Sequence, residues 1–336
     1  MRRSIPKQMI LVFITMFLLL CCFLQLANAS DLEKVKKAIK KKGAKWEAGE
    51  TSISRLPEYE RELRLGAILD DEMLLEGKPD KSAKPNGTRL PKEFDWRDKD
   101  GQNWVTPVRD QGGCGSCWAF GSIAQLESVK MIAEGTPDPD LDLSEQYIVS
   151  CDSINYGCSG GYMYPAYDFL RDTGTPDEEC YRYLARDADT GALCKDACLD
   201  PPLVTINNWS RVALNVDALK AAVYEHPITV AFWVYKDFFY YTGGVYKYAW
   251  GELRGGHAVC VVGWNSKGKY FICKNSWGTG WGESGYFNIA YSEVTNEMRF
   301  GMQAGNFDMS APSLAPPRES RPETLVTVWG EIKNSH

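Results

Sequence analysis

Apolar residues along this chain of 336 residues recur with two different spacings, and each spacing predicts one kind of element. From Trp118 to Glu134 they return every three or four positions, which predicts a helix with Ser116 as its N-cap and Gly135 as its stop. Shorter helices are predicted over residues 31–45, 56–65 and 216–225. Strands are predicted over residues 228–234, 257–264 and 269–275. The pattern therefore indicates an α+β protein in which a mainly helical part precedes a β-rich part.

The N-terminus has the arrangement of an export signal. Basic residues at positions 2, 3 and 7 precede an apolar run from Met9 to Leu24, and Ala27 and Ala29 form a small-residue cleavage site. The run of about 16 residues is short for a membrane-spanning helix, which needs about 20. We therefore expect residues 1–29 to be a cleaved signal peptide, with an uncleaved anchor as the alternative. Export predicts a secreted, periplasmic, cell-surface or lysosome-like location and no stable membrane partner.

Three further regions follow the signal peptide. Residues 30–89 carry two predicted helices and end in a linker rich in Pro, Gly, Lys and Asn, so we interpret them as a pro-segment. The alternative is an independent helical module. Residues 90–310 are long enough for a two-lobed domain, and we place its lobes at about 98–205 and 206–307. Residues 311–336 contain four prolines and form a predicted C-terminal tail.

The charge differs between these regions. Residues 90–310 contain 18 Lys and Arg against 29 Asp and Glu, whereas residues 31–49 contain 7 against 3. A basic helix is attracted to an acidic domain, and protonation of carboxylates weakens that attraction. The composition thus predicts that the pro-segment docks through its basic residues and that mild acid loosens it and promotes self-cleavage near Arg89. An acidic domain also argues against nucleic acid as a partner.

Cys117 opens the longest predicted helix, in the stretch Gln111-Gly-Gly-Cys-Gly-Ser-Cys-Trp-Ala-Phe120. Unpaired N–H groups and the helix dipole at a helix N-terminus favour a thiolate over a thiol. A thiolate beside the side-chain amide of Gln111, which can hold a developing oxyanion, indicates a nucleophile. The alternatives are a buried structural cysteine, a redox pair with Cys114, and a zinc site, for which only one histidine is suitably placed.

The same stretch resembles the active site of the papain-like cysteine peptidases. Three further motifs of that family follow in the same order, namely Cys151-Asp…Gly157-Cys158-Ser-Gly-Gly161, Gly256-His257-Ala258-Val259 and Lys274-Asn275-Ser276-Trp277-Gly278-Thr-Gly-Trp281-Gly282. The similarity covers about residues 90–305. It implies the two-lobed papain-like fold, with a helical N-terminal lobe, a β-barrel-like C-terminal lobe and the active-site cleft between them.

Of the three histidines, His257 is the candidate base. His336 is the last residue, and His226 precedes Pro227 at the end of a predicted helix, where we expect it to cap the helix C-terminus. His257 lies between two glycines and a predicted strand, where another chain can approach closely. The matching motif assigns the catalytic role to it.

Hairpin geometry places Asn275 beside His257. A three-residue loop over 266–268, whose last glycine is left-handed, would pair Asn265 with Lys269. In that register Asn275 and His257 share one face of the two strands, because side chains alternate with a period of two. Asn275 can then fix the orientation and tautomer of the imidazole.

The cysteines fit this register. Cys260 and Cys273 would lie on opposite faces of the hairpin and cannot meet disulfide geometry, so we expect both to be reduced. Eleven cysteines, less these two, Cys117 and the two in the apolar run, leave six, which allow fifteen sets of three bridges. By resemblance to the family, the pairs are Cys114 with Cys158, Cys151 with Cys194, and Cys180 with Cys198.

The resemblance implies a cysteine endopeptidase made as a zymogen. Cys117 and His257 would form a thiolate–imidazolium pair, with Gln111 holding the oxyanion and Asn275 orienting the imidazole. Polypeptides are the implied substrates and the pro-segment is the implied intramolecular inhibitor. We expect a monomer that needs no metal and no organic cofactor.

The family also implies the residues that contact substrate. Gly160 and Gly161 would pair with the substrate backbone. Tyr162, Met163 and Ala258 would border the pocket for the second residue upstream of the cut, and their apolar character predicts a bulky hydrophobic preference. Two tryptophans complete the set. Trp277 would shield the bond between His257 and Asn275, and Trp281 would wall the leaving-group side.

Two alternative functions remain open. One is an exopeptidase of the same fold, as in the cathepsin B branch, which blocks its cleft with a His-containing loop. Only Asp152 and the stretch Ser153–Gly157 separate Cys151 from Cys158, and no histidine lies nearby, which favours the endopeptidase. The other is a catalytically silent binding homologue, which would be expected to lack one of the catalytic residues, whereas all of them are present.

Overall fold

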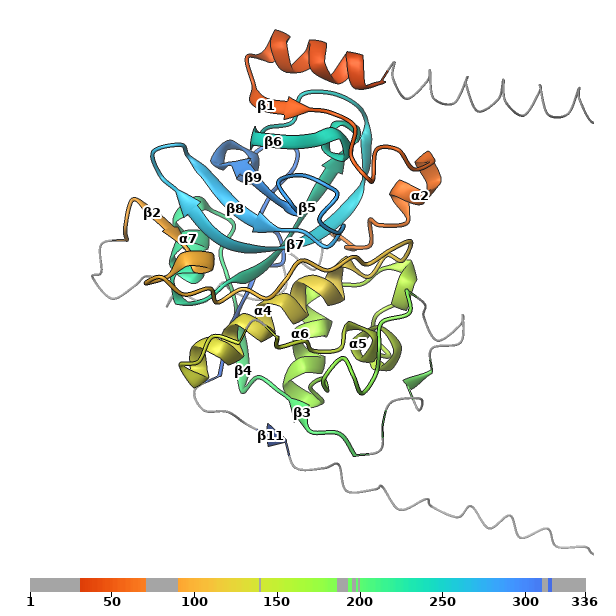
Figure 1. Ribbon diagram of the computed structural model, residues 1–336, viewed down its shortest axis with the longest axis vertical. Coiled ribbons are helices and arrows are strands. Elements are labelled where there is room, and N and C mark those ends of the chain that lie inside the picture. Colours follow the sequence, from red (N-terminus) through yellow and green to blue (C-terminus); the bar gives the residue numbers. More distant parts are fainter. Residues whose placement is uncertain are drawn as a thin grey trace, which may run out of the picture.

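The computed structural model describes residues 31–70, 90–138, 140–185, 193–194, 198, 200–309 and 314–315. They form a helical lobe and a lobe built on a curled sheet, and an N-terminal segment (residues 31–70) runs along the sheet lobe (Figure 1). The apolar run 9–24, the linker 78–88 and most of the tail 311–336 lie outside the described residues. In the described parts, no helix is both long and apolar enough to cross a membrane.

The helical lobe is built on α4 (Cys117–Glu134), which is buried on nearly every side. As predicted, α4 ends at Gly135, which adopts the left-handed conformation with φ 66°. Its start differs from the prediction in one respect. Ser116 stands at the N-cap position, but its hydroxyl bonds to the hydroxyl of Tyr183 at 2.7 Å and not to a helix N–H. Two further helices pack against α4, namely α5 (Glu145–Cys151) and α6 (Met163–Asp172).

The second lobe is a seven-stranded sheet with the order β1-β6-β9-β8-β7-β2, in which β5 also pairs with β7. All of its strand pairs are antiparallel except β6 with β9. Helix α7 (Val216–Glu225), at the predicted bounds, packs on β7. The strands are β1 (Lys45–Ala48), β2 (Glu93–Asp95), β5 (Ile228–Tyr235), β6 (Tyr241–Tyr246), β7 (Leu253–Asn265), β8 (Tyr270–Lys274) and β9 (Tyr286–Ala290).

The remaining elements are short. Two separate two-stranded ladders join β4 (Asn208–Arg211) to β10 (Gly305–Asp308) and β3 (Leu203–Val204) to β11 (Leu314–Ala315). In the described parts of the chain, 3₁₀ turns cover Trp96–Asp98, Gly157–Ser159, Lys236–Tyr240 and Tyr291–Val294. The larger apolar core lies on the sheet and is rich in aromatic side chains, among them Phe232, Phe238 and Trp264.

The β7–β8 hairpin keeps the predicted pairing near its middle but has a different turn. Asn265 pairs with Tyr270, and Lys269 adopts the left-handed conformation (φ 57°) that was predicted for the glycine before it. A bulge further along β7 then takes up one residue, so Val261 pairs with Cys273 as predicted. The extra turn residue and the bulge cancel, and the two strands therefore present the predicted faces.

The N-terminal segment extends the sheet and then leaves it. A helix over residues 31–42 is followed by β1, which pairs with β6, and by helix α2 (Glu58–Glu62). Both helices are shorter than predicted. Trp46 anchors the segment, because its indole is buried and donates a hydrogen bond to the Lys247 carbonyl at 2.9 Å.

The prediction that basic residues of this segment pair with acidic residues of the domain is wrong. Among the described residues, the ion pairs across the interface join carboxylates of the segment to Lys236 and Arg254 of the domain. Lysines of the segment lie over aromatic rings instead, as Lys42 does over Tyr248 at 4.4 Å. Net charge summed over a region therefore does not identify the charges that meet at an interface.

Three disulfides join the pairs that the resemblance implied, which are Cys114–Cys158, Cys151–Cys194 and Cys180–Cys198. Cys260 and Cys273 are both free and buried, as the register predicted.

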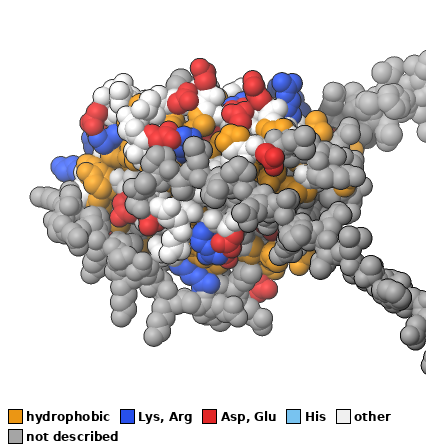
Figure 2. Space-filling view, turned by 90° about the horizontal axis from the view of Figure 1, so that it is seen from below, with side chains coloured by type: hydrophobic (Ala, Val, Ile, Leu, Met, Phe, Trp, Pro, Cys, Tyr) orange, Lys and Arg blue, Asp and Glu red, His pale blue; other side chains and the backbone are white. Residues whose placement is uncertain are grey.

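The outer face of the helical lobe is a mixed surface. Acidic, basic and apolar side chains are interspersed on it, and no histidine is visible among its described side chains (Figure 2). Both histidines of the described parts, His226 and His257, are buried. His226 is the C-cap residue of α7, as predicted, and its backbone N–H donates to the Ala222 carbonyl at 3.3 Å, while its ring nitrogens face the carbonyl oxygens of Pro227 and Phe307.

Candidate active site

The candidate nucleophile, Cys117, is the first residue of α4 and is completely buried. Gly66 of the N-terminal segment donates its backbone N–H to the sulfur at 3.3 Å. Burial raises the pKa of the Cys117 thiol to about 11, although the N–H groups of Ala258, Gly66 and Trp118 act to lower it. While the N-terminal segment covers it, Cys117 is therefore a thiol. The predicted thiolate applies only after the segment has left the site.

The candidate base, His257, lies on β7 next to Ala258, whose backbone N–H acts on the Cys117 sulfur. Its Nε2 is 2.7 Å from Oδ1 of Asn275. That oxygen also accepts the N–H of Ser276 at 2.8 Å, so it is the acceptor and Nε2 carries the proton. In neutral His257 the unprotonated nitrogen is therefore Nδ1, which makes no hydrogen bond of ordinary geometry among the described residues, although the backbone of Arg64 acts on the ring. Nδ1 is the atom that can take a proton from the thiol.

Burial also changes the ionisation of this histidine. It lowers the pKa of His257 to about 4, although the hydrogen bond to Asn275 and the backbone of Arg64 act to raise it. Trp277 covers the imidazole, with ring centroids 4.6 Å apart, and is itself buried. The covered site thus holds a neutral thiol and a neutral imidazole.

Trp281, predicted to wall the leaving-group side, is completely buried in this state. Its ring packs on Trp277 and Phe238 at centroid distances of 5.0 and 4.9 Å. The neighbouring Gly280 accepts a backbone hydrogen bond from Ser52 of the N-terminal segment. Contact of Trp281 with a substrate stays a prediction.

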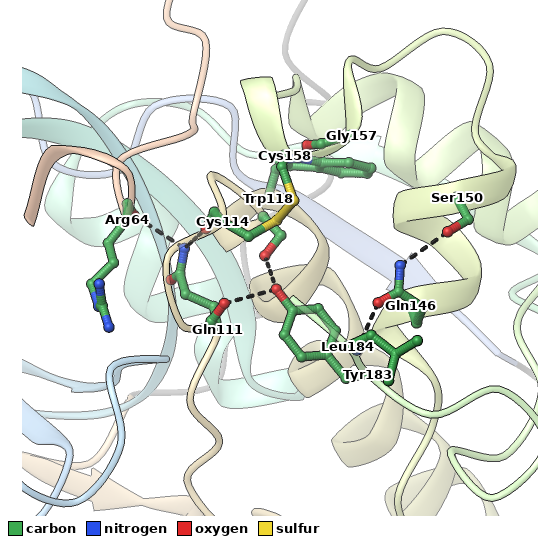
Figure 3. Close-up of a disulfide and its surroundings, with 11 residues drawn as sticks. Arg64, Gln111, Cys114, Trp118, Gln146, Ser150, Gly157, Cys158, Tyr183 and Leu184 are labelled. Carbon is green, nitrogen blue, oxygen red and sulfur yellow. Dashed lines mark hydrogen bonds between the residues drawn. A yellow bond between two sulfur atoms is a disulfide. The ribbon is translucent and has the colours of Figure 1, made fainter. Parts of the chain in front are cut away.

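Gln111 is oriented from both ends of its side-chain amide. Oε1 accepts the hydroxyl of Ser276 at 2.7 Å, and Nε2 donates to the carbonyl of Cys114 at 2.8 Å. The same nitrogen donates to the carbonyl of Arg64 at 3.1 Å, and Figure 3 shows Arg64 beside the amide. One side-chain N–H of Gln111 thus donates to a carbonyl group of the segment. Once the segment has left, the same N–H is available to donate to an oxyanion.

Tyr183 supports the same loop from the helical lobe. Its hydroxyl donates to the backbone carbonyl of Gln111 at 2.8 Å (Figure 3). It also contacts the hydroxyl of Ser116 at 2.7 Å. Tyr183 lies three residues after Cys180, which a disulfide ties to Cys198. The tethered loop therefore contacts both ends of the active-site turn, at the backbone of Gln111 and at the side chain of Ser116.

Residues 64–69 fill the space between the two lobes, which we call the cleft. Ala67 N donates to Gly256 O on β7 at 3.1 Å, and Ile68 N donates to Gly161 O in the helical lobe at 2.9 Å. Gly161 N donates in turn to Gly66 O at 2.8 Å. The segment thus makes the strand-like pairing with Gly161 that the resemblance assigned to substrate.

Side chains beside this pairing form an apolar cluster. Ala67 packs in one core with Met163 and Ala258, which are fully buried, and Leu69 lies against that core. Gly160, in the left-handed region (φ 121°), leaves room for the segment, because a Cβ there would lie 2.8 Å from Gly66 O. Tyr162 is only half-buried.

Gln303 also contacts the chain in the cleft, and sequence reasoning missed it. Its Nε2 donates to Ile68 O at 2.8 Å, and its Oε1 accepts the N–H of Met163 at 3.0 Å. Tyr183 and Ser276 were missed as well. Gln303 and Tyr183 are far in sequence from the residues that they contact, so no local pattern marks them, whereas Ser276 lies inside the Lys274–Gly282 motif.

The described residues support neither of the two alternative sites, a redox pair of cysteines or a zinc site. Cys114 is bonded to Cys158, so it does not form a redox pair with Cys117. In the described parts of the chain, no three His, Cys, Asp or Glu side chains cluster so as to hold a metal ion.

Known proteins match this chain over most of its described length. A family model described as papain family cysteine protease matches residues 90–305. Cathepsin B-like CP3 of Giardia intestinalis is 39% identical over 232 residues, which are 66% of this chain and 76% of that protein. Cathepsin B-like CP2 of the same organism is 37% identical over 241 residues, 68% of this chain and 80% of that protein. The digestive procathepsin L2 proteinase from Tenebrio molitor larval midgut superposes with a TM-score of 0.69 at 27% identity, over 92% of this chain and 96% of that one.

Proposed function

This chain belongs to the papain family of cysteine proteases, and we propose that within this family it is an exported endopeptidase made as an inactive precursor. The observation that carries the proposal is the convergence of Cys117, His257, Asn275 and Gln111 on one site that a segment of the same chain fills. The proform of a digestive proteinase is among the similar solved structures, which supports the precursor interpretation.

The proposed reaction begins when residues 64–69 leave the cleft. Water then reaches the pair, and the helix N-terminus together with protonated His257 stabilises a thiolate on Cys117. The sulfur attacks the scissile carbonyl carbon, and the N–H groups of Gln111 and Cys117 hold the oxyanion, each such donor contributing about 3 kcal/mol. His257 gives its proton to the leaving amine as the C–N bond breaks. It then takes a proton from water, which hydrolyses the thioester to regenerate the thiol.

The N-terminal segment, on this proposal, is the pro-segment and inhibits by occupying the cleft without being cut. It presents the N–H of Gly66 to the sulfur at 3.3 Å, which is a hydrogen-bond donor and not a carbonyl carbon. It also occupies Gln111 through the Arg64 carbonyl. Both contacts must break before a substrate can bind.

The placement of the histidines favours cleavage within chains over removal of terminal residues. The family's exopeptidase branch places histidine on a loop across the cleft. This chain has three histidines, of which His226 is buried against backbone, His257 is the base and His336 ends the chain. Neither of the two described histidines is therefore available to bind a terminal carboxylate. The names of the Giardia relatives contain cathepsin B, so exopeptidase activity remains the second candidate.

The apolar cluster around Ala67 supports the proposed preference for a hydrophobic residue at the second position upstream of the cut. Met163 and Ala258 would line that pocket, and Gln303 would contact the substrate backbone as it does Ile68. Three disulfides are consistent with export, because such bonds persist outside the reducing cytosol. We expect the matured enzyme to act as a monomer.

The test uses the matured protein and its Cys117→Ala variant. Internally quenched peptides, blocked at both ends and with leucine or glycine at the second upstream position, are offered beside unblocked ones. We expect cleavage of the blocked leucine peptide, none by Cys117→Ala, and titration of one site by an epoxide thiol reagent. Cleavage of unblocked peptides alone would support the exopeptidase. No cleavage and no titration would support a silent homologue.

A further inference from the structure

Two cations of the catalytic domain, Lys236 and Arg254, are buried beneath the N-terminal segment, each with a side chain 11% exposed. Arg254 binds Glu58 and Glu62 of helix α2, the latter at 2.8 Å. Lys236 binds Asp31 at 2.9 Å and lies 3.8 Å from Glu58. Three carboxylates of the segment thus converge on two cations of the domain.

The two cations lose most of their partners when the segment leaves. The domain itself supplies Glu252, whose Oε1 is 2.6 Å from Arg254 and 3.8 Å from Lys236. Nε of Arg254 is buried and has no hydrogen-bond partner among the described residues. Two positive charges would then share one carboxylate, with the ring of Trp250 beside Lys236, and such a pair attracts a new carboxylate.

The position of this pair relative to the scissile bond follows from the course of the segment. The chain runs from Glu62 to Gly66, which contacts Cys117, and then to the pairing with Gly161 on the side assigned to upstream substrate residues. Arg254 binds the portion before Gly66 and therefore lies on the leaving-group side. It precedes His257 by three residues on β7, about 10 Å at about 3.3 Å per residue.

We propose that Lys236 and Arg254 form a carboxylate-binding site on the leaving-group side of the cleft. The site selects polypeptides with Asp or Glu two or three residues downstream of the cut, since about 10 Å corresponds to about three extended residues. This inference rests on the proposed endopeptidase activity. The same two side chains hold the pro-segment in the precursor and an acidic substrate in the matured enzyme.

The experiment compares two amidated, internally quenched peptides with the matured enzyme. They are identical except for Glu or Gln at the second and third positions after the cut. We expect kcat/KM to be about 3- to 10-fold higher for the Glu peptide at low ionic strength, and this ratio to shrink with added salt. Arg254→Gln should bring the ratio close to one, and Arg254→Glu should invert it. Because both rates come from one enzyme preparation, the ratio does not depend on the fraction that folds.

Lys236→Gln provides a second variant and should reduce the ratio in part. Lys267→Gln, at an exposed position in the β7–β8 turn, is the matched control and should keep the wild-type ratio. Equal cleavage of the two peptides by the wild type, or a ratio unchanged in Arg254→Gln, would overturn the site and leave the endopeptidase standing. Cleavage of neither peptide would overturn the proposed function and the site with it.

Discussion

The N-terminal segment can reach Cys117 only with glycine at position 66. A Cβ on Gly66 would lie 1.8 Å from the carbonyl oxygen of Gly115, 2.3 Å from its carbonyl carbon and 2.6 Å from its Cα. All three are backbone atoms, and the adjacent Cys114 is held by a disulfide, so the loop has little freedom to retreat. The first of these contacts falls short of an ordinary 3.4 Å separation by about 1.6 Å. Gly66→Ala must therefore lift the segment off the sulfur.

The size of the effect follows from the contacts that this displacement breaks. They are the bond from Gly66 N to the Cys117 sulfur (3.3 Å), the bond from Gly161 N to Gly66 O (2.8 Å) and the bond from Gln111 to Arg64 O (3.1 Å). Each contributes about 0.5 to 1.5 kcal/mol net. Loss of all three costs about 2 to 4 kcal/mol, which raises the fraction of precursor with an open cleft about 30- to 1,000-fold.

Covalent labelling of Cys117 in the full-length precursor measures that fraction. An epoxide thiol reagent is added at neutral pH, and the labelled precursor is quantified by mass at short times, before processing. The labelling rate of Gly66→Ala should exceed that of the wild type by the factor above. Lys41→Ala, at an exposed position of the helix over residues 31–42, is the matched control and should label like the wild type. Equal rates for Gly66→Ala and wild type would refute the steric argument.

Three further outcomes are expected. Tyr183→Phe removes the hydroxyl that holds the Gln111 carbonyl at 2.8 Å, so steady-state kinetics of the matured enzyme should show kcat reduced about 5-fold with KM within about 2-fold; a change confined to KM would contradict a positioning role. Asn275→Ala should lower kcat/KM about 10- to 100-fold. It should also move the alkaline limb of the pH profile to lower pH, because the lost amide oxygen stabilises the imidazolium of His257; an unmoved limb would count against that bond. In the precursor, alkylation of Cys117 by a small neutral reagent should keep accelerating above pH 9, since the pKa of its thiol is about 11, whereas in the matured enzyme it should level off below pH 7. A precursor rate that levels off near pH 7 would show that the segment does not suppress the thiolate.

Local periodicity was enough to predict the elements that carry the site. The spacing of apolar residues placed the helix that begins at Cys117 within one residue, and alternation placed His257 and Asn275 on one face. The turn of the β7–β8 hairpin was predicted wrongly. An extra turn residue and a bulge compensate for each other, so the alternation of side chains along the two strands reveals neither of them. Periodicity indicates which face of a strand is buried, but it does not indicate where a β-ladder accommodates one extra residue.

Contacts between distant segments could not be predicted in the same way. Tyr183 reaches Gln111 across 72 positions, and Gln303 reaches Ile68 across 235. Nothing near either residue in the sequence indicates its partner. The polarity of the segment's ion pairs was missed for a related reason, because the burial of Arg254 against α2 depends on the assembled fold and not on the sum of charges.

The N-terminal segment acts on chemistry as well as on access. Burial raises the pKa of the Cys117 thiol to about 11 and lowers the pKa of His257 to about 4, so the proton stays on sulfur and the ring stays neutral. A substrate that filled the same space would bury the same two groups, yet it would place a carbonyl oxygen at Gln111 and a carbonyl carbon at the sulfur. The segment instead directs an N–H to the sulfur, and that bond lowers the energy of the resting state without leading to attack. The segment also runs past the thiol in the direction opposite to that of a substrate, because residues 64–69 pass from the leaving-group side to the upstream side of the cleft. The inhibition therefore depends both on the direction of the chain and on the backbone group that faces the thiol.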